Sequence, residues 1–421
     1  MALASLLSRP FRDLLPDTGV ERRYVLVSLI SSIGTGLFLS GNAVFGTQVV
    51  GLSAQEVGLS LSAAGVAGLL GAGTMGGLAD RFGARRMMLL LYTLEGLGYL
   101  AFCFVGSFLL FAAVTSLLAA IGFGKGTASA ALVSAIAGEA GRVRLRAQSR
   151  SLFNLGFSLG AALSALAMTI ATLPAYYALP IGNALALFAG ALLVRKLPET
   201  TPSASHVPRR AFAALRNLPF LGTIALNCVV GLHGSMVLVV VPLWVLERTS
   251  APHALIGILL VVNTLTCVLL QVRASKGTET LAGSVRKARW SAAVLLPACL
   301  LLGLSGEVSP LFAVALILVG YFLLSLGEVM QTASAWGMSY SLAPKHAEAE
   351  YLGASTMSVA GESIVGPAVG TWATLTFGLL GWTSLGLVIL VAAAALGPVT
   401  AWTARSLARR HPDPIPVPLP A

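Results

Sequence analysis

The chain has 421 residues, of which 56% are hydrophobic and only 10% are charged, whereas an ordinary soluble domain carries roughly 25% charged residues. A typical water-soluble enzyme is excluded, because this composition cannot supply a charged surface free of large apolar patches. The net charge of +11 does not indicate a nucleic-acid-binding protein either, since the basic residues lie between apolar segments and do not gather on one solvated face. The composition therefore predicts an all-α integral membrane protein.

Residues 1–23 contain four arginines and no apolar run long enough for a signal peptide, so they are expected to form a cytoplasmic tail. Twelve apolar runs follow, with lengths close to the roughly 20 residues that a membrane-spanning helix needs. In chain order the expected spans are 24–46, 57–79, 87–106, 108–138, 151–172, 175–194, 218–246, 254–272, 290–306, 310–342, 351–377 and 380–403.

A polar interval rich in Pro, Ser and Arg divides these spans into two sets of six. The sequence thus predicts a six-helix bundle at 24–195, a cytoplasmic linker at 196–217, a second six-helix bundle at 218–403 and a cytoplasmic tail at 404–421. With both termini inside, all but two of the 27 lysine and arginine residues lie on the cytoplasmic side or in the linker and tails. This distribution follows the positive-inside rule, so we expect a multi-pass cell-membrane protein in this orientation.

The two halves carry an internal repeat. Gly122 and the string Thr-Ala-Ser-Ala that ends at Ala130 recur 205 residues later, from Gly327 to Ala335. Gly160-Ala161 matches Gly366-Pro367 at an offset of 206 residues. Because the matching segments lie in spans of the same rank in each half, the two bundles are expected to be pseudo-symmetric.

Patterns of catalysis and metal binding are missing from the sequence. The four cysteines (Cys103, Cys228, Cys267 and Cys299) lie inside apolar runs without metal-ligand spacing, so they are expected to be small core residues. There is no Walker lysine loop, His-Glu-x-x-His motif or Gly-x-Ser-x-Gly motif. We therefore expect neither an enzyme nor an ATP-driven pump, with no catalytic residues, no metal and no cofactor.

After the second span comes Gly76-Gly-Leu-Ala-Asp80-Arg81-Phe-Gly83-Ala84-Arg85-Arg86. This segment resembles the cytoplasmic loop signature of the major facilitator superfamily, glycine-x-leucine-alanine-aspartate-arginine-x-glycine followed by basic residues, and it lies in the loop where that family carries it. Ala84 departs from the pattern, because the family usually has a basic residue there. The resemblance covers the whole chain in topology and about eleven residues by motif, and it implies a secondary transporter.

The physical properties of the signature fit a conformational latch. Gly76 allows close helix packing, Gly83 permits a tight turn, and Asp80 at a helix end can pair with arginines or accept from an adjacent helix N-terminus. The latch residues are expected to be Gly76, Asp80, Arg81, Gly83, Arg85, Arg86 and Glu139, which has several arginines nearby at the cytoplasmic end of span four. The alternative is that the arginines only fix the membrane orientation.

Two further family patterns are imperfect in this chain. Efflux members usually carry an arginine and then a glutamine-glycine pair in helix four, where this sequence has Gly122 and Lys125-Gly126. Antiporters typically carry a Gly-Pro pair in helix five, whereas this sequence has Gly160-Ala161 there and Gly366-Pro367 in span eleven. The resemblance therefore points to a drug/proton antiporter of the twelve-helix type with two departures from its motifs.

Ionisable groups inside the spans are candidates for function, because a charged group at mid-bilayer costs at least roughly 2.5 kcal/mol. Glu328 and Glu362 are the favoured proton carriers, since neither has a nearby cation in its own half of the sequence, while Lys125 and Glu95 on neighbouring spans are also open to a static ion pair. The full set expected to serve proton coupling or line the substrate cavity is Lys125, Glu328, Glu362, Glu95, His233, Asn42, Asn154, Asn227, Gln331 and Trp336. For each of the last five residues, interhelical packing is the alternative role.

The leading hypothesis is proton-coupled efflux of small amphipathic compounds by alternating access. A second is uptake or facilitated diffusion of a small polar or anionic solute, which Lys125 would suit, and a third is a membrane receptor or scaffold that has lost transport. The expected partners are a small-molecule substrate, protons and membrane lipids, with no nucleic acid, and the protein is expected to be monomeric.

Overall fold

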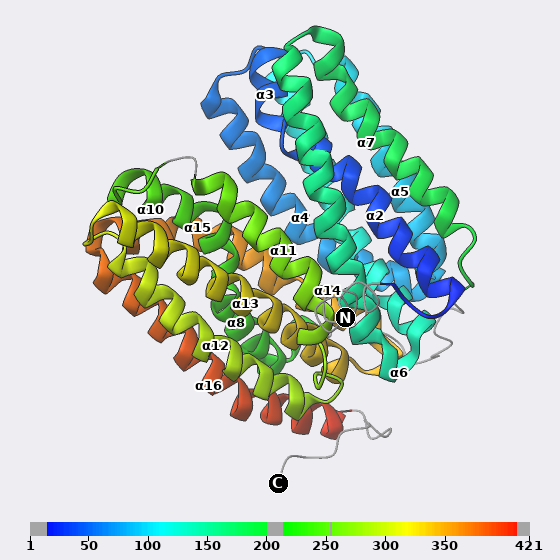
Figure 1. Ribbon diagram of the computed structural model, residues 1–421. Coiled ribbons are helices and arrows are strands. Elements are labelled where there is room, and N and C mark those ends of the chain that lie inside the picture. The colour runs from blue at the N-terminus through cyan, green and yellow to red at the C-terminus, as the bar shows by residue number, and fades with distance from the viewer. Residues whose placement is uncertain (1–14, 200–213, 253–254, 411–421) are drawn as a thin grey trace, which may run out of the picture. The chain divides into compact units, whose positions relative to one another are not determined.

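The structure is a computed structural model that describes residues 15–199, 214–252 and 255–410 (Figure 1). Within these ranges every regular element is a helix, and nine helical segments are long and apolar enough to cross a membrane. The chain divides into two compact units. Unit 1 comprises Met1–Phe212 and Lys345–Thr356, and unit 2 comprises Ala213–Pro344 and Met357–Ala421.

Unit 1 is built from long helices that run back and forth. Its elements are α2 (Gly19–Leu39), α3 (Asn42–Gln48), α4 (Ala54–Phe82), α5 (Ala84–Ala101), the short 3-10 turn η1 (Phe102–Phe104), α6 (Phe108–Ile170), α7 (Leu173–Val194), the 3-10 turn η4 (Lys345–Ala347) and α14 (Glu348–Ser355). The hydroxyl of Thr18 begins α2 by accepting from the Glu21 amide, which satisfies one of the unpaired donors of a helix start.

Helix α6 contains two membrane spans. Gly138 interrupts it with φ 63° and ψ −173°, a backbone conformation that glycine adopts without steric cost. The segments on either side, Phe108–Glu139 and Gly141–Ile170, are each apolar and long enough to cross a membrane. The first span of the chain is likewise interrupted, because α2 ends at Leu39 and the short helix α3 follows.

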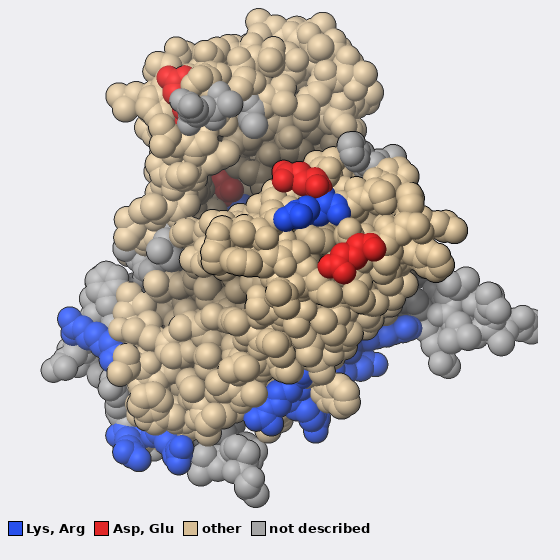
Figure 2. Space-filling model, turned by 90° about the vertical axis from the view of Figure 1, so that its left-hand side faces the viewer, with Lys and Arg blue, Asp and Glu red and all other residues tan. Residues whose placement is uncertain are grey.

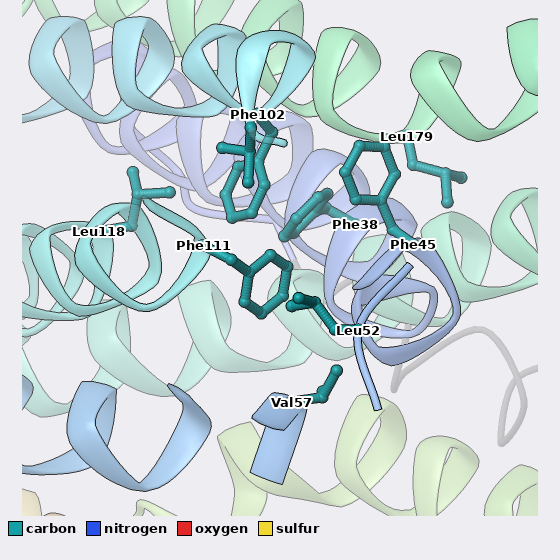
Figure 3. Close-up of a cluster of buried hydrophobic side chains, with 9 residues drawn as sticks. Phe38, Phe45, Leu52, Val57, Phe102, Phe111, Leu118 and Leu179 are labelled. Carbon is teal, nitrogen blue, oxygen red and sulfur yellow. The ribbon is translucent and has the colours of Figure 1, made fainter. Parts of the chain in front are cut away.

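Aromatic and aliphatic side chains form a buried core in unit 1 (Figure 3). Its buried members are Phe38, Phe45, Leu52, Val57, Phe102, Val105, Phe111, Leu118 and Leu179. The Phe102 ring meets those of Phe45 and Phe111 edge to face, with centroids 5.9 and 5.6 Å apart. This is a favourable arrangement for aromatic quadrupoles, and it joins α3 and α6 through η1.

Glycines allow α2 to pack closely against the second span of α6. A Cβ atom on Gly160 would overlap the Ile33 carbonyl oxygen, and one on Gly156 would overlap the Ser32 hydroxyl. Small residues at such positions let two backbones approach each other and gain van der Waals contact, which stabilises helix pairs in lipid.

Unit 2 contains the 3-10 turn η2 (Ala214–Arg216), α8 (Leu218–Gly231), α9 (His233–Ser235), the π-helical turn η3 (Met236–Val240), α10 (Val241–Arg248), α11 (Leu255–Ala274), α12 (Leu281–Leu304), α13 (Pro310–Leu342), α15 (Met357–Phe377) and α16 (Leu379–Arg410). The seventh expected span, 218–246, corresponds to one long apolar stretch, Leu218–Arg248. Within it the π-helical turn η3 interrupts the α-helical hydrogen-bond pattern, while the residues that join the four elements keep helical backbone angles.

The repeated glycines occupy matching places in the two units. Gly122 of α6 faces Glu95 of α5, and Gly327 of α13 faces Leu295 of α12. Gly160 packs against the first span, and Gly366 of α15 packs against Ser235 in the seventh span. Each pair thus joins helices of the same rank within its own unit.

Large apolar side chains remain exposed along the helices. Leu97, Leu117 and Leu192 in unit 1, with Leu260 and Leu311 in unit 2, are each more than half exposed. On the face shown in Figure 2, wide uncharged areas separate the groups of charged side chains. Apolar surface of this extent is stable in lipid and not in water, so the chain is a membrane protein.

Candidate functional site

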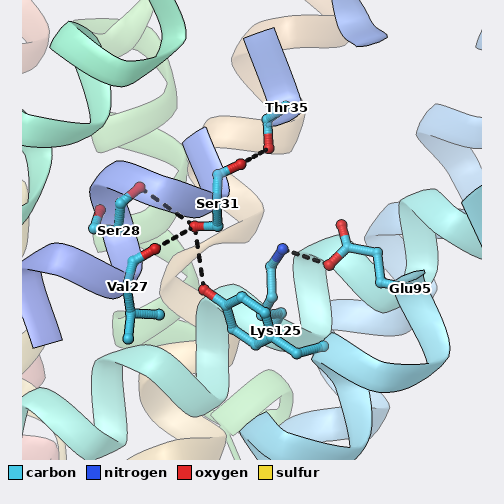
Figure 4. A network of polar contacts seen from close by, with 7 residues as sticks. Val27, Ser28, Ser31, Thr35, Glu95 and Lys125 are labelled. Carbon is cyan, nitrogen blue, oxygen red and sulfur yellow. Dashed lines mark hydrogen bonds and ion pairs between the residues drawn. The ribbon is translucent and has the colours of Figure 1, made fainter. Parts of the chain in front are cut away.

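Lys125 of α6 and Glu95 of α5 form an ion pair inside unit 1 (Figure 4). The Lys125 Nζ atom donates to Glu95 Oε2 and also lies 4.7 Å from the centroid of the Tyr92 ring. Only 17% of the lysine side chain and 8% of the glutamate side chain are exposed. Opposite charges buried this deeply cancel each other, which removes most of the penalty of placing either one alone in lipid.

Local sequence explains why the two charges meet. Gly122 lies one helical turn before Lys125, and the Glu95 Oε1 atom lies 3.8 Å from the place where a side chain on Gly122 would begin. Tyr92 lies three residues before Glu95, so its ring projects from the same face of α5 as the carboxylate. Gly122 thus lies in ordinary van der Waals range of the glutamate, and Tyr92 presents its aromatic face to the ammonium group.

A chain of hydrogen bonds ties this ion pair to the first span (Figure 4). The Tyr92 hydroxyl donates to the Ser31 hydroxyl at 3.3 Å, and Ser31 donates to the Val27 carbonyl oxygen at 2.8 Å. Thr35 donates to the Ser31 carbonyl oxygen at 2.9 Å. The site in unit 1 thus connects α2, α5 and α6, and Ser31 and Tyr92 belong to it although they were not among the residues expected from the sequence.

Glu328 lies near the middle of the 33-residue helix α13 in unit 2. Its Oε2 atom accepts a hydrogen bond from the side-chain amide of Asn263 on α11 at 2.7 Å, and the same amide nitrogen lies 3.2 Å from the Ser325 hydroxyl. Asn263 was not among the residues expected from the sequence. Its position as a polar residue inside the apolar run Leu-Leu-Val-Val-Asn263-Thr-Leu-Thr-Cys is the signal that marks it.

Glu362 of α15 lies against the broken seventh span. Its Oε2 atom is 3.1 Å from the place where a Cβ on Gly231 would stand, and a Cβ on Gly234 would overlap its Oε1 atom. His233, between these glycines, is buried, and its Nδ1 atom lies 3.0 Å from the Val230 carbonyl oxygen. The structure thus places Glu362 and His233 on adjoining elements, while Glu328 is bonded to α11.

The neutral candidates occupy different environments. The Asn227 amide donates to the Thr223 carbonyl oxygen of its own helix at 3.1 Å. Asn42 and Gln331 are buried, and Asn154 and Trp336 are partly buried. Among the described residues, the Asn42 oxygen and the Asn154 amide nitrogen have no hydrogen-bond partner. The Asn227 side-chain oxygen likewise has no partner among the described residues. An orphaned buried polar atom is costly, so these three asparagines remain candidates for contact with a ligand.

Part of the expected latch lies outside the described residues, namely the side chains of Asp80 and Arg81 and the surroundings of Gly76. Gly83 ends the turn between α4 and α5 with φ 88°, a value that a residue with a Cβ rarely adopts. Arg85 and Arg86 lie 3.4 and 3.9 Å from the Glu199 carboxylate at the start of the linker.

Glu139 is paired within unit 1, but with a residue from late in the sequence. Its Oε1 atom lies 2.8 Å from Lys345 Nζ, and Arg142 lies 3.6 Å from the Glu348 carboxylate. Glu348 also accepts from the Ser134 hydroxyl at 2.6 Å. These three contacts fasten the segment Lys345–Thr356, which contains α14, to α6, and α14 also packs against α4.

The apolar helices and the few charged groups between them define a membrane protein with several spans. Residues 24–367 match the family model described as Major Facilitator Superfamily. The match extends over most of the chain, so the protein belongs to the major facilitator superfamily, and this membership supports a function in membrane transport.

Solved structures with the same fold are distant in sequence. A bacterial homologue of the iron transporter ferroportin, solved in an outward-facing state, is 13% identical, with a TM-score of 0.70 over 92% of this chain and 100% of the other. The human organic anion transporter MFSD10 (TETRAN) is 19% identical, with a TM-score of 0.63 over 90% and 100% of the two chains. The proton:xylose symporter XylE is 14% identical, with a TM-score of 0.66 over 90% and 95%. No curated protein sequence matches the chain.

Proposed function

We propose that this protein is a proton-coupled secondary transporter that exports small amphipathic compounds by alternating access. The observation that carries the proposal is the presence of two carboxyl groups within the spans of unit 2, Glu328 and Glu362. The lysine and arginine residues in the helices of this unit lie close to helix ends, at Arg248, Arg273, Arg286, Lys287, Arg289, Arg405 and Arg409. A carboxyl group that takes up and releases a proton inside a span can link substrate movement to the proton gradient.

The pairing in unit 1 supports a substrate that is neutral or cationic. Because Glu95 balances Lys125, the pair carries no net charge, so it does not repel an amphipathic cation by electrostatics. The loop signature is common to the whole family, so the support for export over uptake comes from helix four, where Lys125-Gly126 retains a cation and a glycine at the place of the efflux motif. Protons, a small molecule and lipids are then the partners of a monomeric transporter.

Twelve spans in two pseudo-symmetric bundles belong to the same proposal. Nine are long and apolar enough by composition, and we assign the remaining three to α2, α4 and α15, which have 21, 29 and 21 residues. About 20 residues suffice to cross the hydrocarbon layer. The basic residues at the ends of α11, α12 and α16 support a cytoplasmic location for both termini in the cell membrane.

The ion pairs of the segment Lys345–Thr356 support a cytoplasmic latch. The segment is contiguous in sequence with unit 2 but packs within unit 1 through Glu139–Lys345 and Arg142–Glu348. Exposed ion pairs each contribute only about 0 to 1 kcal/mol, so together they bias a conformational equilibrium without locking it. Asp80, Arg81 and Gly76 are proposed to act in the same latch, and Asp80→Asn should slow transport while leaving substrate binding intact.

Uptake or facilitated diffusion of an anionic solute is the second candidate, and Lys125 is the observation that favours it. Its side chain is 17% exposed, which leaves room for an approaching anion to compete with Glu95. Lys125→Met separates the two functions. An anion carrier loses binding when this charge is removed, whereas an exporter of cationic or neutral compounds keeps it.

Purified protein in proteoliposomes tests the proposal. A pH gradient is imposed, and three probes of different chemistry are offered, namely ethidium as an amphipathic cation, benzoate as an anion and xylose as a neutral polar solute. We expect the gradient to drive accumulation of ethidium against its concentration gradient. Accumulation of benzoate or xylose in place of ethidium would support the second candidate function, uptake or facilitated diffusion. Ethidium movement that does not depend on the pH gradient would contradict proton coupling.

A further inference from the structure

The seventh span is interrupted at the point where α15 packs on it. Helix α8 ends at Gly231, the single turn α9 covers His233–Ser235, and the π-helical turn η3 precedes Pro242 in the first turn of α10. Glycine lowers helix stability by about 1 kcal/mol relative to alanine, and proline supplies no N–H to the carbonyl four residues earlier. Residues 231–242 therefore form a weak section in an otherwise apolar helix, and π-helical turns are frequent at functional sites.

The carboxyl group of Glu362 fills the space that this interruption leaves. Both of its oxygens lie where side chains on Gly231 and Gly234 would begin. The Ser235 hydroxyl donates to the Glu362 carbonyl oxygen at 3.3 Å, and Ser235 also packs against Gly366, one turn further along α15. The two glycines thus form a seat for this carboxyl group, and a methyl group at Gly234 would require the carboxyl group to move.

Comparison with unit 1 shows that this seat is a departure from the internal repeat. At the offset of 206 residues that relates Gly160 to Gly366, Glu362 corresponds to Gly156. Gly156 packs against Leu29 and Ser32 of α2, as Glu362 packs against Gly231 and Gly234 of the seventh span.

The larger side chains therefore lie on opposite helices in the two units. In unit 1 the fifth span has a glycine at this position and the first span has the larger residues, whereas in unit 2 the eleventh span has a glutamate and the seventh span has the glycines. In unit 1 the partner helix, α2, is continuous past this point as far as Leu39. The carboxyl group and the break in the helix occur together in unit 2.

Resting on the proposed function, we infer that Glu362 binds the coupling proton and that its protonation controls the conformation of residues 231–240. The ionised carboxylate needs polar surroundings, and in the interrupted segment its oxygens lie against the backbone at Gly231 and Gly234. When a proton from water binds a carboxylate oxygen, this electrostatic requirement is removed and the segment is free to rearrange. Release of the same proton to water restores the interrupted form, and no other bond is made or broken.

Glu328 fits this role less well. It lies within α13, which is continuous from Pro310 to Leu342, and it accepts from the neutral Asn263 amide. Because α13 is continuous at this point, a change in the protonation of Glu328 would not affect an interrupted helix. Cys228 of α8 interacts electrostatically with Glu362, and the titratable His233 lies on α9, next to Gly234 in sequence. The charged residues Glu247, Arg248, Arg405 and Arg409 lie towards the far ends of α10 and α16.

Hydrogen–deuterium exchange of the purified full-length protein in lipid nanodiscs tests the inference without a substrate. After correction for the intrinsic effect of pH, we expect the backbone of residues 231–240 to exchange faster in acid than in alkaline buffer. Glu362→Gln, which mimics the protonated acid, should show fast exchange at both pH values. Glu328→Gln and His233→Gln should retain the pH dependence.

Two glycine variants provide a matched pair. Gly234→Ala places a methyl group where the carboxyl group lies and should abolish the pH dependence, whereas Gly222→Ala, in the same span with an ordinary 3.4 Å contact to Val399, should preserve it. The inference is wrong if Glu362→Gln keeps the pH dependence of the parent, or if His233→Gln alone removes it. A pH-independent parent would also overturn it, even where proteoliposomes show proton-coupled transport, so this failure is distinct from failure of the proposed function.

Discussion

Removal of one member of the Lys125–Glu95 pair should destabilise unit 1 far more than removal of both. Lys125→Met deletes the ammonium group and leaves a carboxylate whose side chain is only 8% exposed. Breaking a buried ion pair in this way typically costs about 3 to 5 kcal/mol, because the remaining charge is buried without compensation. Glu95→Gln leaves the lysine in the same position, next to the Tyr92 ring, and should cost a similar amount.

The double variant restores electrical neutrality with side chains of nearly the same volume. Replacement of a buried ion pair by neutral residues is often close to neutral in stability, so we expect a coupling energy of about 2 kcal/mol or more between the two sites. The free energy of unfolding is measured by titration of detergent-solubilised protein with sodium dodecyl sulfate, for the parent, both single variants and the double variant. Additive effects of the two single substitutions would show that the charges do not stabilise each other, and the reasoning about this site would be refuted.

Other features of the structure lead to three further predictions. Gly160→Ala should cost about 1 to 3 kcal/mol, because its methyl group overlaps the backbone of α2, whereas Gly65→Ala, which lies inside α4 and meets open space, should raise the free energy of unfolding by up to about 1 kcal/mol. Glu139→Lys should alter turnover in vesicles, and the added change Lys345→Glu should restore it, since the swapped charges can still pair; failure of the double variant to recover would contradict the latch. A cysteine at Ser205 should react with an impermeant thiol reagent only from the cytoplasmic side, and labelling in intact cells would reverse the proposed orientation.

The membrane class and the helical character of the chain could be predicted from sequence because they depend on local properties. Long apolar runs bounded by basic residues have few alternatives to membrane helices, and residues 24–367 match the expected family. The boundary at Gly138 coincides with the expected end of the span 108–138. The start of the next helix was harder to foresee, because the span was expected from residue 151 whereas its helix begins at Gly141.

The sequence indicated which residues belong to the candidate sites, but not which residues they contact. Lys125 and Glu95 could be recognised as intramembrane charges on neighbouring spans, yet only the packed helices show that the two side chains meet. Asn263 was not among the neutral amides singled out from the sequence, because its contact with Glu328 joins two different helices. The ion pairs of Lys345 and Glu348 with α6 join residues some 200 positions apart, and no local pattern reports such a contact.

The most direct test of proton coupling is to let a substrate gradient move protons. Proteoliposomes that contain the pH-sensitive dye pyranine are prepared with equal pH on both sides, and an outward gradient of ethidium is imposed. If the protein exchanges this compound for protons, the lumen should become acidic as ethidium leaves, and Glu362→Gln should abolish the acidification while exchange of labelled for unlabelled ethidium continues. Ethidium efflux by the parent protein without any change in internal pH would contradict proton-coupled export.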